Sequence, residues 1–241
     1  MKALALHGWD VPPGEARRIQ LQLRERMERE DRLPPLRWVA GADVAFELRR
    51  RRGSCSGSGR AIAGVIVYSF PELAEVERAT AERPLTFPYV PGLLSFREAP
   101  ALLAAFERLR CEPDLIFCDG HGYAHPRRFG IACHLGVLLD RPTVGCAKSR
   151  LTGWHREPAR KAGGWAPLMD LSGGRRGETI GATLRTRDDV RPIYVSPGHR
   201  VSLARAIELV LAVCDGYRIP RPTREADHYV EAVKRGDWPR R

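Results

Sequence analysis

Two long segments with the residue alternation of β-strands lie close together near the start of the chain. From Trp38 to Phe46 every second residue is apolar, and Ala61 to Phe70 is rich in β-branched residues. The segment between them, Arg49 to Gly59, consists of Gly, Ser, Cys and Arg, a composition typical of a loop. The pattern therefore predicts an antiparallel hairpin, on which the rest of the fold must be built.

Strand-like and helix-like segments alternate after this hairpin. Further strands are predicted near residues 75–87 and at 114–118, 143–146, 179–186 and 193–195. Helices are predicted at residues 14–30, from Ser95 to Leu109, near 128–139, and at 202–215 and 223–235, while residues 156–176 are expected to be an irregular excursion. A hairpin followed by this alternation indicates an α/β fold whose mixed sheet carries helices on both faces. No break in composition divides the chain, so we expect a single domain.

The charge balance favours a polyanionic partner. The chain has 40 Lys and Arg residues against 29 Asp and Glu residues, a formal net charge of +11. Few of the basic residues are Lys, and we attribute the Arg excess to a GC-rich coding sequence, so charge is a weak argument for nucleic acid. No segment approaches the ~18 apolar residues of a membrane span, and the six cysteines lack a Cys-x-x-Cys pair. We expect a cytoplasmic protein with free, buried thiols.

Three carboxylates lie at positions that an ordinary apolar core explains poorly. Asp43 interrupts the apolar strand of residues 39–46, where an unpaired carboxylate is costly to bury. Asp119 follows the predicted strand at 114–118 and precedes a Gly-His-Gly sequence, which lets backbone approach a ligand at the edge of a sheet. Glu98 lies near the start of a predicted helix.

Each of these carboxylates also has a structural interpretation. Asp43 can pair with one of the many arginines, and Asp119 can close a turn. Glu98 can complete a capping box with Ser95 as the N-cap. Taken together, three such carboxylates in a basic protein indicate a hard-cation site, because Mg²⁺ prefers carboxylate, water and phosphate oxygens. We therefore expect phosphodiester chemistry at a Mg²⁺ site, with Mn²⁺ as a substitute.

Lys148 is one of few lysines and follows the predicted strand at 143–146. Two interpretations are open: its ammonium group neutralises phosphate charge, or it is an exposed lysine at a strand end. The glycines and the Lys-Ser pair between Gly145 and Gly153 do not have the spacing of a P-loop. Hydrolysis of a nucleoside triphosphate is therefore not predicted.

The turn at residues 88–92, Pro-Tyr-Val-Pro-Gly, is stiffened by two prolines. It can present Tyr89 as a wedge against a base step, as proteins that unstack DNA do, or it can be an ordinary connection with a packed tyrosine. None of the histidines has zinc-like spacing. His199 is the best functional candidate among them, because it immediately precedes a predicted helix.

In order and spacing, these motifs resemble those of endonuclease V, the inosine-directed nuclease family. The resemblance runs over nearly the whole chain, from about residue 15 to residue 228. The matching segments are residues 39–46, 88–98, 113–128, 145–153, 196–202 and 222–227.

The resemblance implies an RNase H-like fold in which Asp43, Glu98 and Asp119 are catalytic and hold the metal. It implies that Lys148 contacts the region of the scissile phosphate and that His199 is a catalytic residue beside the metal site. The turn becomes the strand-separating wedge, with Tyr89 at its tip, and backbone groups read a flipped hypoxanthine. The residues expected to contact nucleic acid are Pro88, Tyr89, Val90, Pro91, Gly92, Gly122, His125, Ser149 and Leu151.

The implied activity is a Mg²⁺-dependent DNA repair endonuclease that recognises deoxyinosine. It would nick the same strand one nucleotide 3′ of the lesion, at the second phosphodiester, leaving 3′-hydroxyl and 5′-phosphate ends. Two alternatives stay open: an endoribonuclease that acts on inosine-containing RNA, and a non-catalytic nucleic-acid-binding protein. We expect a monomer, without a membrane partner.

We expect one domain over residues 1–241, with its motif-bearing core at about 15–228. Residues 229–241 are expected to be a tail, either solvated or in contact with nucleic acid. We assign no function to the loop at residues 49–59 or to the excursion at residues 156–176.

Overall fold

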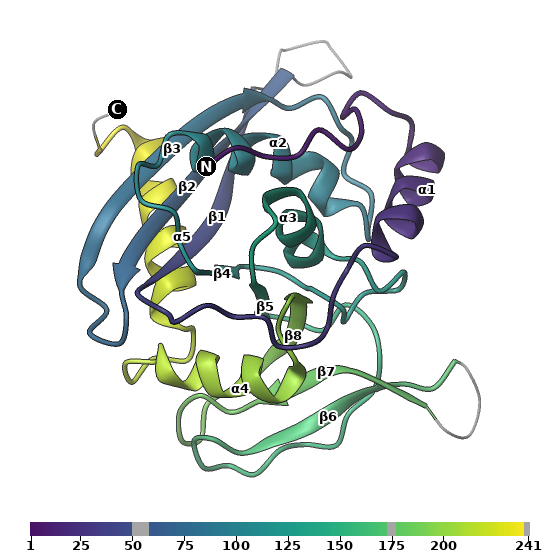
Figure 1. Ribbon diagram of the computed structural model, residues 1–241, viewed down its shortest axis with the longest axis vertical. Coiled ribbons are helices and arrows are strands. Elements are labelled where there is room, and N and C mark those ends of the chain that lie inside the picture. Colours follow the sequence, from purple (N-terminus) through teal and green to yellow (C-terminus); the bar gives the residue numbers. More distant parts are fainter. Residues whose placement is uncertain (50–57, 173–176, 239–241) are drawn as a thin grey trace.

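The computed structural model describes residues 1–49, 58–172 and 177–238, and it contains one mixed sheet with helices on both faces (Figure 1). The sheet has eight strands in the order β3-β2-β1-β4-β5-β8-β7-β6. The strands are β1 (Trp38–Arg49), β2 (Ser58–Ser69), β3 (Glu75–Pro84), β4 (Leu115–Cys118), β5 (Thr143–Ala147), β6 (Trp165–Asp170), β7 (Glu178–Leu184) and β8 (Ile193–His199). The helices are α1 (Pro13–Arg24), α2 (Leu94–Glu107), α3 (Ile131–Leu139), α4 (Leu203–Ala212) and α5 (Arg221–Arg235). The predicted fold class is confirmed.

The predicted hairpin is confirmed and forms one half of the sheet. Strands β1 and β2 are antiparallel over their whole length, and β2 continues to β3 in the same way. Strands β4 and β5 then add in parallel to β1, and β8, β7 and β6 follow as antiparallel neighbours. The carboxyl ends of β1, β4 and β5 therefore point in the same direction.

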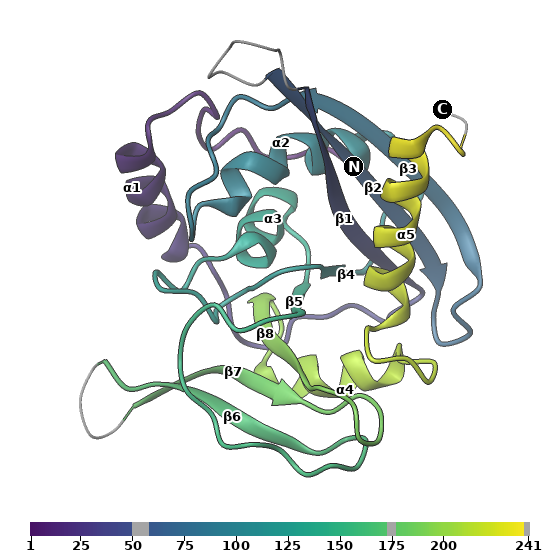
Figure 2. The same ribbon diagram turned by 180° about the vertical axis from the view of Figure 1, so that it is seen from behind.

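The alternation along β1 assigns its side chains to two different cores. Ala40 and Ala42 belong to the core under α2 and α3, whereas Val39 belongs to the core under α4 and α5. Figure 2 shows α5 lying across the strands of the hairpin, on the face opposite α2. Gly41 is required here, because a Cβ at this position would lie 1.9 Å from the carbonyl oxygen of Pro222 in α5. This close approach seats α5 directly on β1.

Two sequence-based expectations about the elements are wrong. The excursion at residues 156–176 contains β6, an edge strand whose alternating exposed and buried residues pair with β7. Ser95 is not a helix cap: α2 begins one residue earlier with Leu93 at its N-cap, and the Ser95 hydroxyl is hydrogen-bonded to Nδ1 of His134 at 3.0 Å. The capping box with Glu98 is therefore absent.

The helix predicted at residues 223–235 is confirmed, and it includes the first part of the expected tail. Helix α5 continues to Arg235 and buries Tyr229, Val230 and Val233 against the sheet. The expected core boundary at residue 228 thus falls inside a helix. The ring of Trp238 packs on Tyr229 at a centroid distance of 5.9 Å. The loop at residues 50–57 and the terminal residues 239–241 lie outside the described residues.

The described cysteines are free thiols, and three of the five are fully buried, as expected. No helix among the described residues has the length and apolar character that crossing a membrane requires.

Candidate functional site

The parallel register of β1 and β4 brings the first two predicted carboxylates together. Ala42 of β1 lies opposite Cys118 of β4, so Asp43 and Asp119 are the next residues on adjacent strands. The backbone N–H of Asp119 donates to the carbonyl of Ala42 at 3.2 Å, which fixes this register. Lys148 directly follows β5, the next strand of the sheet. Three predicted site residues therefore meet at one edge.

A third aspartate joins them from α5, and the sequence interpretation did not identify it as a site residue. Asp227 lies on α5, the helix that packs on Gly41. Gly41 is two residues before Asp43 and lies on the same face of β1, so α5 passes close to Asp43. One oxygen each from Asp43, Asp119 and Asp227 lies within 4.8 Å of the other two. We call these three residues the acidic cluster.

Lys148 is the cation that the structure places in the acidic cluster. Its Nζ lies 2.6 Å from Oδ2 of Asp119 and 3.4 Å from Oδ1 of Asp227. Burial lowers the pKa of Lys148, but the charges of Asp119, Asp43 and Asp227 outweigh burial and raise it overall. The ammonium group is therefore charged at neutral pH.

One lysine does not neutralise the acidic cluster. Burial and the neighbouring Asp119 raise the pKa of Asp43 to about 8, although its Oδ1 accepts a hydrogen bond from the N–H of Val44 at 2.8 Å. Burial likewise raises the pKa of Asp119, against the opposing effect of Lys148. The site thus concentrates more negative charge than its own groups compensate.

Glu98 contributes to this excess from α2. Its side chain is buried, and burial followed by the charges of Asp43 and Asp119 raises its pKa well above the usual range. It lies outside the set of atoms that approach within 4.8 Å. The Glu98 carboxyl therefore feels the charges of the acidic cluster, but its oxygen atoms are not among those that approach one another within 4.8 Å.

The donor set fits a hard divalent cation. The acidic cluster supplies only carboxylate oxygens, which are the ligands that Mg²⁺ prefers. Carboxylates with raised pKa values at a partly exposed sheet edge are stabilised in their charged form by a bound cation. The structure therefore contains a candidate metal site at Asp43, Asp119 and Asp227.

A rigid turn stands beside this site. Tyr89 is 71% exposed at the tip, whereas Phe87 before it is buried and its carbonyl accepts from Nη1 of Arg97 at 2.9 Å. On the other side, the carbonyl of Gly92 accepts from Gln20 Nε2 at 3.1 Å and lies 2.9 Å from His125 Nε2. Both ends of the turn are therefore anchored, and the tyrosine projects from a fixed base.

A hollow of about 370 Å³ separates this turn from the acidic cluster. Its walls are residues 89–92 of the turn, residues 119–121 after β4 and residues 147–151 after β5, together with His125. Most residues that were expected to contact nucleic acid line it. Pro88 and Gly122 do not: Gly122 is buried against β8, where its N–H donates to Oγ of Ser196 at 2.9 Å.

The expectation that His199 lies beside the metal site is wrong. His199 is the last residue of β8 and pairs with Thr143, the first residue of β5, whereas Lys148 follows the last residue of that strand. The histidine therefore lies at the amino end of β5, whereas the acidic cluster lies at the carboxyl ends of β1 and β4. It is buried there, and its Nδ1 accepts from the N–H of Glu28 at 3.2 Å. It was a functional candidate because it precedes a predicted helix, but it belongs to β8, which is longer than predicted.

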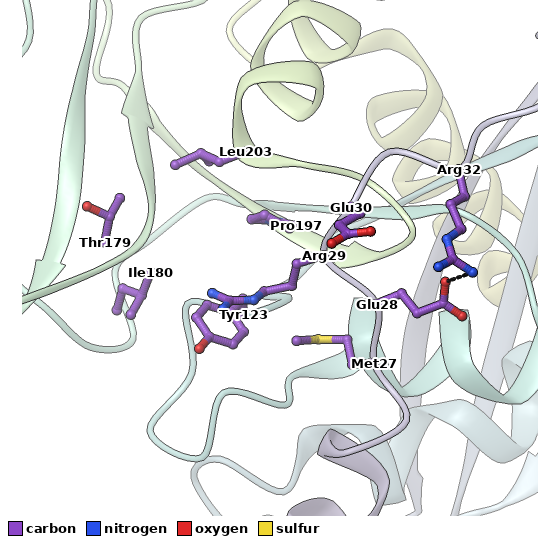
Figure 3. Close-up of a pocket in the computed structure, with 10 residues that line it drawn as sticks. All are labelled: Met27, Glu28, Arg29, Glu30, Arg32, Tyr123, Thr179, Ile180, Pro197 and Leu203. Atoms are coloured by element: carbon purple, nitrogen blue, oxygen red, sulfur yellow. Dashed lines mark ion pairs between the residues drawn. The ribbon is translucent and has the colours of Figure 1, made fainter.

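A second hollow, of about 550 Å³, shares no residue with the acidic cluster (Figure 3). The guanidinium of Arg29 lies over the ring of Tyr123, 4.4 Å from its centroid. Of the two glutamates in its wall, Glu28 is paired with Arg32 at 2.9 Å. Its only other carboxylate is that of Glu30, so among the described residues this hollow has no group of three carboxylates like the acidic cluster.

The comparisons with known proteins agree with this geometry. The sequence model of the family described as endonuclease V matches residues 21–228. A protein of Roseiflexus castenholzii called endonuclease V is 51% identical over 227 residues, which are 94% of this chain and 96% of the relative.

Two solved structures show the same fold. The endonuclease V of Streptomyces avermitilis is 42% identical with a TM-score of 0.85, and the alignment covers 96% of this chain and 97% of that one. The endonuclease V of Ciona intestinalis, solved with a 24mer DNA containing an inosine followed by a ribo-adenosine, is 25% identical with a TM-score of 0.72. That alignment covers 93% of this chain and 98% of the Ciona chain.

Proposed function

Because the chain belongs to the endonuclease V family of nucleases, we propose that it is a Mg²⁺-dependent endonuclease that nicks DNA containing deoxyinosine. The observation that carries this proposal is the acidic cluster, with one lysine among three aspartates at a sheet edge. Cleavage falls one nucleotide 3′ of the lesion, at the second phosphodiester, and leaves 3′-hydroxyl and 5′-phosphate ends.

Asp43, Asp119 and Asp227 would hold the metal, and the buried carboxyl of Glu98 would add its charge to the site. Bound Mg²⁺ would supply an activated water and stabilise charge on the leaving oxygen. The three aspartates come from β1, β4 and α5, which are packed together, so the acceptors are oriented before substrate arrives. Lys148 places a fixed positive charge beside them, where the phosphate develops charge.

The hollow beside the acidic cluster is the proposed binding site for the extruded base. It lies between the turn that carries Tyr89 and the segment after β5 that begins with Lys148. A base that leaves the stack beside Tyr89 would thus enter a pocket adjoining the metal ligands. Extrusion is easiest at a mispaired base, which contributes to selectivity.

The experiment that tests the function uses a labelled strand carrying one deoxyinosine, with and without Mg²⁺, and maps the cut against a sequence ladder. A metal-dependent nick one nucleotide beyond the lesion supports the proposal. A matched RNA strand in the same assay tests whether inosine in RNA is the preferred substrate. Binding without any cut in Mg²⁺ or Mn²⁺ would leave a nucleic-acid-binding protein and overturn the proposed activity.

We further propose that one endonuclease V-like domain, with its motif-bearing core at about 15–228, acts as a monomer in the cytoplasm. Light scattering of the protein with and without an inosine oligonucleotide checks the monomeric state, and a dimeric mass would contradict it.

We expect the substitution Lys148→Gln to lower the rate of nicking about 100-fold, because it removes a charge next to the reacting phosphate. The measurement is a single-turnover rate with saturating enzyme, so that weaker binding does not contribute. Lys161→Gln is the matched control, since Lys161 is exposed and pairs with Asp188 at 3.3 Å, away from the acidic cluster. An equal loss in both variants would argue against the role of Lys148.

We expect Tyr89→Ala to slow nicking of duplex DNA about tenfold, the order of one lost base–aromatic stacking contact. Nicking of a single strand with the same lesion should change little, because no neighbouring base pair must be opened. Since Tyr89 is 71% exposed, the melting temperature should not move. Tyr89→Phe keeps the ring and is the control; a loss equal to that of Tyr89→Ala would contradict the wedge.

A further inference from the structure

A third hollow, different from the two described above, adjoins Lys148 on the side away from the turn. Its volume is about 890 Å³, and it shares only residues 148–150 with the hollow proposed for the base. Other parts of its wall come from residues 155–160, residues 185–194 and Arg218. We call this hollow the basic cleft.

The sheet topology places the basic cleft on the same edge as the acidic cluster. Strand β8 runs antiparallel to β5, and Tyr194 near its start lies opposite Ala147 at the end of β5. The end of β7 in turn pairs with the start of β8. Along the carboxyl ends of the neighbouring strands β1, β4 and β5, the residues follow in the order Asp43, Asp119 and Lys148. The residues that precede β8 come next. A strand passing over the acidic cluster along this edge would reach the basic cleft next.

The wall of the basic cleft carries more positive than negative charge, because it contains six Lys and Arg residues against Glu157 and Asp189. Arg185 is buried and paired with Glu157 at 2.6 Å, but the other arginines of the wall have no carboxylate partner among the described ion pairs. These are Arg150, Arg160, Arg191 and Arg218.

Arg218 is the clearest case of an arginine in the basic cleft without a carboxylate partner in the described part of the chain. Its guanidinium donates to the carbonyl oxygens of Arg191 and Lys148 at 2.8 Å and of Pro192 at 3.0 Å. These carbonyl groups hold the guanidinium in place without neutralising it. Burial and the nearby charge of Arg191 lower the pKa of Arg218, so two like charges are held together at the wall of a cleft. An anion placed there would relieve their repulsion.

We propose, on the basis of the proposed function, that the basic cleft binds phosphate groups of the substrate strand that flank the nicked bond. Arg160 and Arg191 are exposed and make the phosphate contacts, while Arg218 fixes the backbone between Lys148 and Arg191. The cleft thus positions the strand on the metal ligands. Its ligand is the phosphodiester backbone, read without regard to base.

The test compares Arg160→Ala/Arg191→Ala with the wild-type protein by fluorescence anisotropy of an inosine oligonucleotide, between about 50 and 200 mM salt. We expect at least about tenfold weaker binding, since two arginines that donate charge-assisted hydrogen bonds to phosphate oxygens are removed. The slope of log affinity against log salt should fall by about 1 for each arginine removed.

Two controls separate phosphate contact from loss of charge. Arg110→Ala removes one exposed arginine near the amino end of β4, at the opposite edge of the sheet, and should leave the salt slope unchanged. Arg160→Lys/Arg191→Lys keeps the charges and should keep the slope near the wild-type value.

Truncated oligonucleotides decide whether the phosphates belong to the substrate strand. Shortening the strand on the side that enters the cleft should abolish the difference between the double alanine variant and wild type. An unchanged salt slope in that variant, or a difference that persists with strands shortened on either side, would overturn the proposal. If the wild-type protein binds but does not nick, the proposed function fails while the slopes still test the cleft. If it nicks and the slopes coincide, the cleft alone fails.

Discussion

Asp119→Asn should reduce nicking by about a thousandfold or more. Its carboxylate oxygen is part of the acidic cluster and also lies 2.6 Å from Nζ of Lys148. Loss of several kcal/mol of metal-based stabilisation of the transition state corresponds to a rate decrease of this order. Asparagine keeps the shape of the side chain and the backbone hydrogen bond to Ala42, so the fold should persist. The measurement is the single-turnover rate on a deoxyinosine strand in Mg²⁺.

Asp140→Asn is the matched control for this substitution. Asp140 ends α3 with a left-handed backbone conformation, φ 52°, which asparagine accepts readily, and it pairs with Arg200 rather than with the acidic cluster. Its rate should equal that of the wild-type protein. Nicking by Asp119→Asn within about tenfold of wild type, with a cooperative unfolding transition, would exclude the acidic cluster as the catalytic centre.

Without metal, the Asp43 carboxyl should contribute a progressive loss of stability as the pH rises from about 4 to about 8. The difference between the wild-type protein and Asp43→Asn isolates this contribution, because the histidines whose pKa values are lowered by burial act in the opposite direction at acidic pH. The pKa of Asp43 is 3.8 in ordinary surroundings and about 8 in the folded protein. Over that window the native state keeps a proton that the unfolded chain releases. Native molecules then bind more protons than unfolded ones, and the free energy of unfolding falls with increasing pH. Asp119 shifts in the same direction. At pH 8 the destabilisation should be on the order of 2 to 5 kcal/mol.

Mg²⁺ should reverse this loss. A cation that binds only the folded state stabilises it by about 2.7 kcal/mol at a concentration 100 times its Kd. For a protein of this size that corresponds to a rise in Tm of about 5–10 °C. The rise should be large at pH 8 and small near pH 5, where the carboxyls retain their protons.

Thermal unfolding at both pH values, with Mg²⁺ or with a chelator, makes this measurement. Asp43→Asn is the informative variant, because in the metal-free protein its Tm should exceed that of wild type by an amount that grows as the pH rises. Equal Mg²⁺ stabilisation of wild type and Asp43→Asn at pH 8 would mean that the cation binds elsewhere.

Much of the fold could be predicted because the alternation of apolar residues is local information. The segments around β1, β2, β4 and β5 each carry a clear pattern, and their order indicated a mixed sheet. Strand β6 escaped prediction, since an edge strand rich in exposed residues, with a Gly- and Arg-rich sequence beyond it, lacks a strong apolar signal. Ser95 matched a capping motif, but the helix begins at the preceding residue and the hydroxyl is used by His134.

The site could be predicted only as far as its residues followed strands. Asp43 and Asp119 end up adjacent because two parallel strands are in register. Asp227 comes from a helix, and its place depends on how α5 packs across the sheet. The signal that could have identified it is Gly41, the one residue of β1 that admits the helix backbone two positions before Asp43. His199 was predicted to lie at the site and does not. It is in β8, which is antiparallel to β5, so it lies beside the start of β5 rather than beside Lys148.

The docking of α5 on Gly41 also determines when the acidic cluster is first complete during synthesis. Asp43 and Asp119 leave the ribosome early, but the third member of the acidic cluster, Asp227, is synthesised much later. Because the acidic cluster requires α5 to be docked on β1, it cannot be complete before α5 has been synthesised. The oxygen atoms of the cluster thus come together only when residues far apart in the sequence have folded as one unit.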